Sequence, residues 1–227
     1  MNHLHKIFIS LTLIISTLFL NAQNDDKSEN SIVKHESYLT FDLFSSLNVF
    51  SPKWRVGYVK TINPKWKIGL NMGYGAKNIS YTYFLDHFEK DYKLWELRPE
   101  IYKVFKRNEK TVKYFSIELF YINHKDILHN SFYYPKNGGE ISYDQVDYQR
   151  YKYGFNFNAG EFIKINNSYR INIFAGLGLR FRSVMFTNIV NSRPSNTFVD
   201  MFDFYEFREK EGLDLGLSYS LGVKLIM

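Results

Sequence analysis

Two long segments alternate between apolar and polar side chains, and this period of two constrains the fold more than any other feature. In residues 169–186, YRINIFAGLGLRFRSVMF, nearly all odd positions are apolar, whereas the even positions include Arg170, Arg180 and Arg182. Residues 212–227, GLDLGLSYSLGVKLIM, alternate in the same way. Because successive side chains of a strand point to opposite faces, both segments are predicted strands with one apolar and one polar face. Strands of soluble proteins are mostly about 5–6 residues long, whereas a tilted membrane-spanning strand needs roughly 9–11.

Similar segments along the chain predict eight strands joined by connections of alternating length. The predicted strands are residues 37–48, 54–62, 66–76, 94–105, 113–125, 148–165, 169–186 and 212–227. The short connections are 63–65, 106–112 and 166–168, and the others are 49–53, 77–93, 126–147 and 187–211. Outer-membrane barrels have short periplasmic turns and longer extracellular loops, so the order favours that architecture. We therefore expect an all-β fold, an eight-stranded antiparallel up-and-down transmembrane β-barrel. Segments 79–85 and 197–207 could extend hairpins above the membrane or raise the count to ten.

The first 36 residues are expected to lie outside the barrel. Residues 1–22 resemble a cleaved signal peptide, because Lys6 precedes an apolar run of 14 residues and Ala22 offers a cleavage point. An uncleaved anchor helix is the alternative, although the run is short for a membrane span. Residues 23–36 are polar and are predicted to form a flexible periplasmic lead-in to the barrel at 37–227. The chain has no cysteine, so export is not accompanied by disulfides.

The last predicted strand carries the pattern polar–x–Gly–x–x–apolar–x–apolar, with Ser220, Gly222, Leu225 and Met227 in those places. This pattern resembles the C-terminal assembly signal of the small outer-membrane β-barrel family, the OmpA/OmpX-like eight-stranded barrels of Gram-negative bacteria. That family usually ends on an aromatic residue, whereas this chain has Met227. The resemblance implies a location in the outer membrane, contact with outer-membrane lipid, and insertion by the barrel-assembly machinery.

If the apolar face meets lipid, the charged side chains of the other face must point into the barrel. The predicted interior residues are Asp42, Arg55, Lys67, Glu96, Arg98, Glu100, Glu118, Lys152, Arg170, Arg180, Arg182, Asp214 and Lys224. Buried charges must be paired, so we expect an ion-pair network that fills the interior and leaves no pore. Arg180 is predicted to pair with Glu118 or Asp214. Glycines on the same face make room: Gly57, Gly69, Gly73, Gly154, Gly160, Gly176, Gly178, Gly216 and Gly222.

Two residues disturb this pattern, and a group of aromatic residues supports it. Pro99 removes a backbone donor inside a strand, which predicts a bulge or a shifted boundary there. Glu161 falls on the lipid face, near the periplasmic end of its strand, where the cost is small. The aromatic residues near strand ends predict interfacial girdles: Trp54, Trp66, Trp95, Tyr169 and Phe181.

Charge and motifs exclude several functional classes. The net charge of +6 is spread along the chain, without the basic run expected of a nucleic-acid-binding protein. The six histidines show no metal-ligand spacing, and the chain has no phosphate-binding loop and no dinucleotide fingerprint. We therefore expect no metal, no cofactor and no nucleic-acid partner.

One constellation suggests catalysis. His129, Ser131 and Glu140 follow the order of the His–x–Ser and Glu of outer-membrane lipid A deacylases, in which the His polarises the Ser and the Glu orients the His. The chain has Phe132 and Tyr133 where that family has Asn–Ala. The preferred hypothesis is a non-enzymatic barrel with a structural or surface-interaction role through its extracellular loops, with an unknown ligand. The alternatives are a deacylase-like hydrolase and a soluble periplasmic lipocalin-like carrier with an apolar interior.

Overall fold

The computed structural model describes residues 37–47, 51–77, 91–136, 138–166, 169–195 and 210–227. The strands are β1 (Ser37–Asp42), β2 (Trp54–Asn63), β3 (Trp66–Ala76), β4 (Lys93–Arg107), β5 (Thr111–Tyr133), β6 (Glu140–Lys164), β7 (Arg170–Val190), β8 (Arg193–Ser195) and β9 (Gly212–Ile226). No helix in these ranges is long and apolar enough to cross a membrane. The predicted segments 1–22, 23–36, 79–85 and 197–207 lie outside the described residues.

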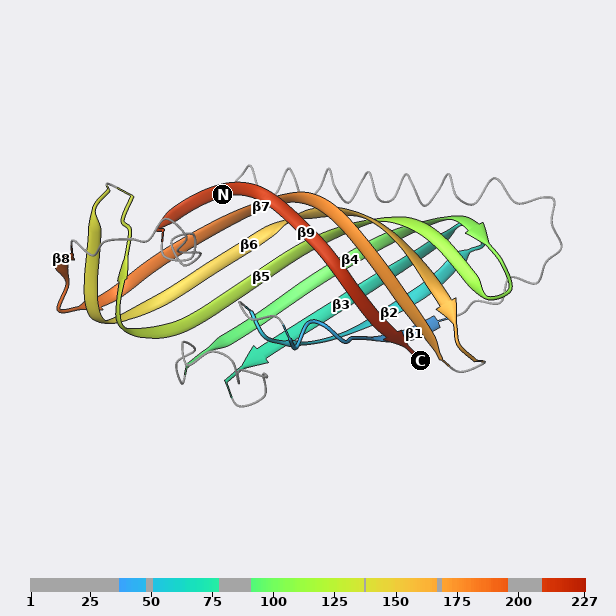
Figure 1. Ribbon diagram of the computed structural model, residues 1–227, viewed down its shortest axis with the longest axis horizontal. Coiled ribbons are helices and arrows are strands. Elements are labelled where there is room, and N and C mark those ends of the chain that lie inside the picture. The colour runs from blue at the N-terminus through green and yellow to red at the C-terminus, as the bar shows by residue number, and fades with distance from the viewer. Residues whose placement is uncertain (1–36, 48–50, 78–90, 137, 167–168, 196–209) are drawn as a thin grey trace. The chain divides into compact units, whose positions relative to one another are not determined.

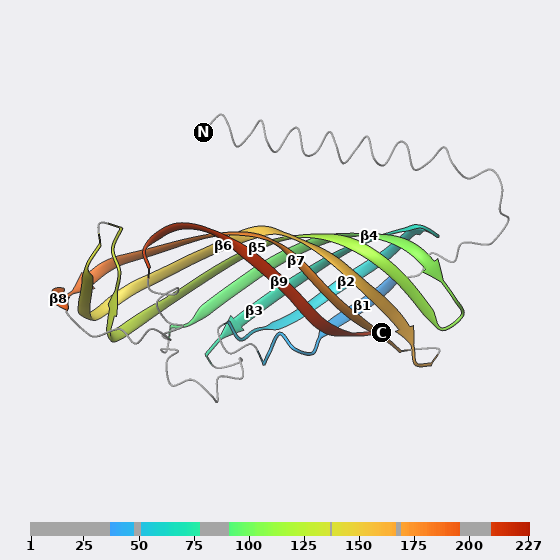
Figure 2. The same ribbon diagram turned by 45° about the horizontal axis from the view of Figure 1, so that its top comes forward.

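Eight strands pair antiparallel into a closed ring (Figures 1 and 2). The order around the ring is β1–β2–β3–β4–β5–β6–β7–β9, and β9 returns to β1. β8 pairs with the first residues of β6, beyond the stretch that β6 shares with β7. The predicted all-β class, the antiparallel pairing and the eight ring strands are confirmed.

The connections alternate in length as predicted, but β4 and β7 are slightly longer than expected, and β5 and β6 are much longer. The turns after β2, β4 and β6 lie at one end of the ring, and the longer connections lie at the other. The expected loop at 126–147 is wrong, because β5 and β6 continue as a paired hairpin up to the pair Tyr133↔Ile141. Only residues 134–139 join the two strands. The hairpin is held by the cluster Tyr133, Tyr143, Val146, Tyr148, Val184 and Phe186.

The effect of Pro99 differs from the expectation. Leu70 of β3 still pairs with Pro99, while the pairing of β4 with β5 skips Arg98 and Pro99 and resumes in the same register at Glu100. Proline has no backbone N–H to give to a neighbour, so the gap is local. The irregularity in this strand pair lies instead between Val104 and Lys106.

The two faces of the ring are those that the period of two predicts. The inward carboxylates of Asp42, Glu96, Glu100 and Glu118 are buried. Every ring strand exposes large apolar side chains on the other face: Leu39, Trp54, Val56, Tyr58, Leu70, Met72, Tyr74, Trp95, Leu97, Ile101, Phe105, Phe115, Ile117, Leu119, Tyr153, Phe157, Ile173, Leu177, Leu179, Phe181, Met185, Leu213, Leu215, Leu217, Tyr219 and Leu221. Glu161 lies on the outer face as predicted, directly opposite Lys113 in the register.

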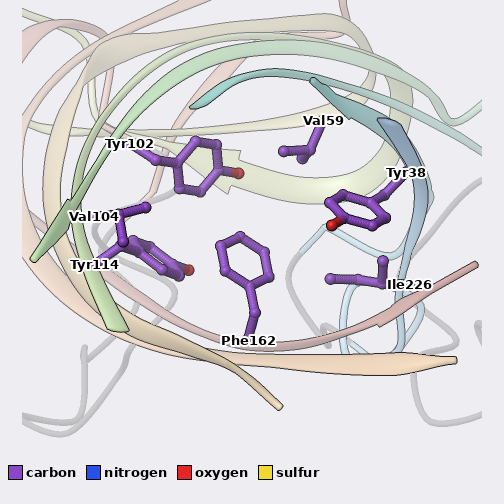
Figure 3. Packing of buried hydrophobic residues seen from close by; sticks show 7 residues of the cluster. All are labelled: Tyr38, Val59, Tyr102, Val104, Tyr114, Phe162 and Ile226. Atoms are coloured by element: carbon purple, nitrogen blue, oxygen red, sulfur yellow. The ribbon is translucent and has the colours of Figure 1, made fainter. Parts of the chain in front are cut away.

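Aromatic and aliphatic side chains close the interior at the end that bears the short turns (Figure 3). The cluster is Tyr38, Val59, Tyr102, Val104, Tyr114, Phe162 and Ile226. Tyr102 and Tyr114 meet edge to face, with ring centroids 4.9 Å apart. This apolar layer forms the floor beneath the charged residues of the interior.

Candidate functional site

Glu96 lies at the centre of the charged interior. Its carboxylate is paired with three cations, Lys53 at 3.5 Å, Arg98 at 3.2 Å, and Arg55. Arg55 also forms an ion pair with Asp42. The positions come from alternation along β2 and β4, which turns Arg55, Glu96 and Arg98 to the inner face. The predicted ion-pair network is therefore present.

Two further carboxylates extend the network toward the aromatic floor. Glu118 accepts hydrogen bonds from Arg98 at 2.7 Å and from Asn156 at 3.0 Å. Glu100 accepts one from the Tyr102 hydroxyl at 2.6 Å and pairs with Lys224 at 3.3 Å. Because these buried anions have both charged and neutral donors, their desolvation is compensated.

Lys53 and Arg150 are interior cations that the sequence analysis missed. Lys53 was assigned to a connection, yet it precedes Trp54, which faces outward, so extending the period by one residue would have placed it inside. Burial lowers the pKa of Lys53 to about 8, and the nearby carboxylate of Glu96 opposes that shift. Arg150 is buried and donates a hydrogen bond to the Ser51 hydroxyl at 3.0 Å. Its inward position follows from the same alternation that places Lys152 inside.

Arg180 points inward as predicted, but the predicted partners are wrong. Glu118 is taken by Arg98, and Asp214 is paired with Arg182 at 3.4 Å. Within the described part of the chain, Arg180 forms no ion pair, and its Nε is buried without a hydrogen-bond partner. Register explains the outcome, because Asp214 stands directly opposite Arg182 on the neighbouring strand.

Glycines on both neighbouring strands accommodate Arg180. Gly154 of β6 and Gly216 of β9 stand opposite it in the two registers. A Cβ atom on Gly216 would lie 3.1 Å from a guanidinium nitrogen of Arg180. The predicted role of the inward glycines, to make room for long side chains, is thus confirmed at this position.

Lys152 also lacks an acidic partner. Neither an ion pair nor a hydrogen bond joins its amine to any other described residue. Its charge is instead repelled by Arg150, Arg180, Lys53 and Arg182, of which Arg182 stands opposite it in the register. Lys152 and Arg180 are therefore two inward cations that the described part of the chain leaves uncompensated.

A cavity of about 530 Å³ lies beside these cations, so the interior is less filled than expected. Its charged lining consists of Asp42, Lys53, Arg55, Arg98, Glu118, Lys152 and Arg180. Ser218 and Asn156 add neutral polar groups. Cations thus outnumber carboxylates along the wall, and this charge-imbalanced cavity is the candidate site.

The structure does not assemble His129, Ser131 and Glu140 into a hydrogen-bonded triad. His129 is exposed, and no hydrogen bond joins any two of these three residues. Glu140 instead accepts a hydrogen bond from the Tyr134 hydroxyl at 3.1 Å. Within the described ranges, no group of three or more histidine, aspartate or glutamate side chains could hold a metal ion.

No family model, no curated protein and no solved structure matches the chain.

Proposed function

We propose that the protein is a non-enzymatic β-barrel of the bacterial outer membrane, with a structural or surface-interaction role carried by its longer connections. The observation that carries this proposal is the apolar outer face, to which all eight ring strands contribute. Soluble monomers rarely expose a contiguous apolar patch of more than a few hundred Å². An apolar exterior around a charged interior is the arrangement of a membrane barrel.

The height of the apolar belt supports the proposal. On β4, the outward positions between Lys93 and Lys103 are Trp95, Leu97, Pro99 and Ile101. Ten residues at about 3.3 Å each, inclined by roughly 40°, rise about 25 Å. That is about the height of the apolar band on outer-membrane barrels.

Aromatic residues stand toward the edges of this belt, where membrane–water interfaces favour them. Trp54 and Trp95 lie near the strand ends that adjoin the longer connections, and both are exposed. At the opposite end, Trp66 stands beneath the ammonium group of Lys103, which lies 4.3 Å from its ring centroid. Tyr169 is exposed at the same end. These positions suit two aromatic girdles.

A hollow of about 670 Å³ on the outer face suits an acyl chain. Its floor carries small residues, Ala159, Ala175 and Gly176, and large apolar side chains such as Phe115 and Leu177 border it. In a lipid bilayer such a hollow would be filled by hydrocarbon. It therefore favours contact with outer-membrane lipid.

The two alternatives have less support. A soluble lipocalin-like carrier requires an apolar interior, whereas this interior holds ion pairs around Glu96 and Glu118. A deacylase-like hydrolase requires a nucleophile activated by a base, and no hydrogen bond joins His129 to Ser131. The β5–β6 hairpin, with buried Tyr133, continues past the belt and offers a rigid support for a surface interaction.

Fractionation followed by gel electrophoresis tests the proposal. We expect the protein in the outer-membrane fraction, with different migration before and after boiling in detergent, because unfolding requires the separation of long antiparallel strand pairs such as β5–β6 and β6–β7. Recovery in the soluble periplasmic fraction would contradict membrane insertion. Equal migration of natively extracted, unheated and boiled protein would contradict a detergent-resistant barrel.

A further inference from the structure

The ring is closed along only part of the joint between β1 and β9. β9 pairs with β7 from Gly212 to Ile226, but with β1 only from Lys224 to Ile226. Three more backbone bonds flank this stretch, two between Leu39 and Met227 and one from the Leu43 amide to the Val223 carbonyl, each at 3.0 Å. Within the described ranges, β9 has no strand partner on this side from Gly212 to Gly222. Figures 1 and 2 show β9 turning away from the chain that follows β1. We call this stretch the open seam.

The seam exists because β1 ends early. It was predicted to reach residue 48, but it ends at Asp42. The Asp42 carboxylate accepts hydrogen bonds from the backbone amides of Phe44 and Ser45, both at 3.0 Å. Aspartate commonly forms such turns by bonding the backbone just ahead of it. On the far side of the turn, the Lys53 amide donates a backbone hydrogen bond to the Ser45 carbonyl at 3.3 Å, so residues 43–47 lie beside the start of β2 rather than extending β1 along β9.

The charge-imbalanced cavity reaches the open seam. Its lining includes Ser218 and Ser220 on the inner face of β9, and Phe44 on the turn. Tyr219 and Leu221, which border the same cavity, are exposed on the outer face at 74% and 76%. At the open seam, the polar cavity therefore opens directly onto the apolar outer face of β9.

The excess of positive charge in the cavity favours binding of an anion. Five cations line it, and the carboxylates that contact them are those of Asp42, Glu96 and Glu118. These carboxylates compensate Lys53, Arg55 and Arg98, so Lys152 and Arg180 remain. Buried cations without a counter-charge are costly, whereas arginine and lysine together bind phosphate oxygens well.

We propose that the cavity binds the phosphate headgroup of an anionic phospholipid through the open seam, between Arg180 and Lys152. The acyl chains lie along the outer face of β9, against Leu217, Tyr219 and Leu221. Seam backbone groups that face a polar headgroup are hydrated or bonded, which removes the cost that they would have in hydrocarbon. The lipid source of the phosphate rests on the proposed membrane location, whereas the oxyanion site does not.

Calorimetric titration of the folded full chain in maltoside micelles tests this site. The two probes are dihexanoyl phosphatidic acid and inorganic phosphate. We expect saturable one-to-one binding of the phosphatidic acid, at least tenfold tighter than that of phosphate. Lys152→Met and Arg180→Gln should each weaken binding at least tenfold. Lys125→Met removes the same charge at an exposed position and should leave the affinity unchanged.

The outcomes separate the parts of the inference. Equal affinity for both probes would overturn the lipid source. If neither probe binds saturably, the site is overturned. Equal affinities in the three variants and the parent chain would overturn it as well. A boiling-dependent gel shift verifies that Lys152→Met and Arg180→Gln are folded. Because the titration uses micelles, its failure is distinct from recovery of the protein in a soluble fraction, which would contradict the proposed location and the lipid source that rests on it, but not the oxyanion site.

Discussion

At the scale of single residues, the stability of the interior depends on how many cations each buried carboxylate contacts. Glu96 contacts Lys53, Arg55 and Arg98, of which only Arg98 belongs to its own strand. Its loss would leave several cations under-compensated at once. Glu118, with Arg98 and Asn156 as donors, has fewer charged neighbours within reach of its oxygens. The stability of the interior is therefore concentrated at Glu96.

Replacing Glu96 by Gln should destabilise the folded chain. Removing one partner of a buried pair typically costs about 3–5 kcal/mol, because the other charge stays buried. The measurement is the urea midpoint of protein refolded into vesicles. Glu109→Gln, at an exposed turn, is the matched control and should leave the midpoint unchanged. Equal midpoints for both variants would mean that the buried pairs add nothing to stability.

The direction of side chains was predictable from sequence, and their partners were not. Direction follows from a local period, so Arg55, Glu96 and Arg180 were placed correctly from neighbouring residues alone. Pairing depends on register between strands, which no local pattern encodes. Glu118 was available to Arg180 by face, but Arg98 on the adjacent strand reaches it. The charge-imbalanced cavity results from that competition and could not be foreseen.

At the scale of elements, the outer part of the β5–β6 hairpin was missed because its burial does not follow a period of two. The register of β6 against β7 shifts between Gln145 and Asp147. Tyr143 and Val146 are both buried although they lie three residues apart. The extra residue of this register irregularity lies in β7, which takes three steps from Thr187 to Val190 where β6 takes two, and Asn188 within it has a φ of 53°. With Tyr143 and Val146 on the same buried side, 140–147 shows no period of two, and this stretch was assigned to a loop.

The outer face of β7 offers a direct test of the apolar belt. Leu179→Arg should lower the free energy of unfolding in vesicles, by about 2–4 kcal/mol if the residue lies near the bilayer midplane, and this is measured as a lower urea midpoint. Asn108→Arg adds the same charge at an exposed turn and serves as control. If Leu179→Arg behaves like this control, the outer face of β7 does not contact hydrocarbon.

At the scale of the whole molecule, all short turns lie at one end of the ring and all longer connections at the other. Alternating connection lengths predicted this arrangement, because successive antiparallel strands reverse direction. The open seam was not predicted, since it depends on a side-chain bond that ends β1 at Asp42. The placement of the connections at the two ends of the ring thus follows from their lengths in the sequence. The closure of the ring between β1 and β9 depends instead on the turn at Asp42.

Trypsin added to intact cells should distinguish the two ends. In the proposed orientation, Lys136 in the β5–β6 connection faces outward from the cell, and Lys110 in the β4–β5 turn faces the periplasm. We expect cleavage after Lys136 and none after Lys110. Lys136→Gln should abolish that fragment, which identifies the site. Cleavage after Lys110 in intact cells would invert the orientation.

The short joint between β1 and β9 also has consequences for folding kinetics. It unites residues from opposite ends of the described sheet, so forming it requires closure of a very long loop, whose entropic cost grows with loop length. In return, the joint gains only the pairs of Thr40–Asp42 with Lys224–Ile226, together with the flanking backbone bonds of Leu39 to Met227 and of Leu43 to Val223. The β5–β6 hairpin, with its brief connection, forms without such a cost. We therefore expect the ring to assemble from the hairpin outward, with the β1–β9 joint the last to form and the first to open.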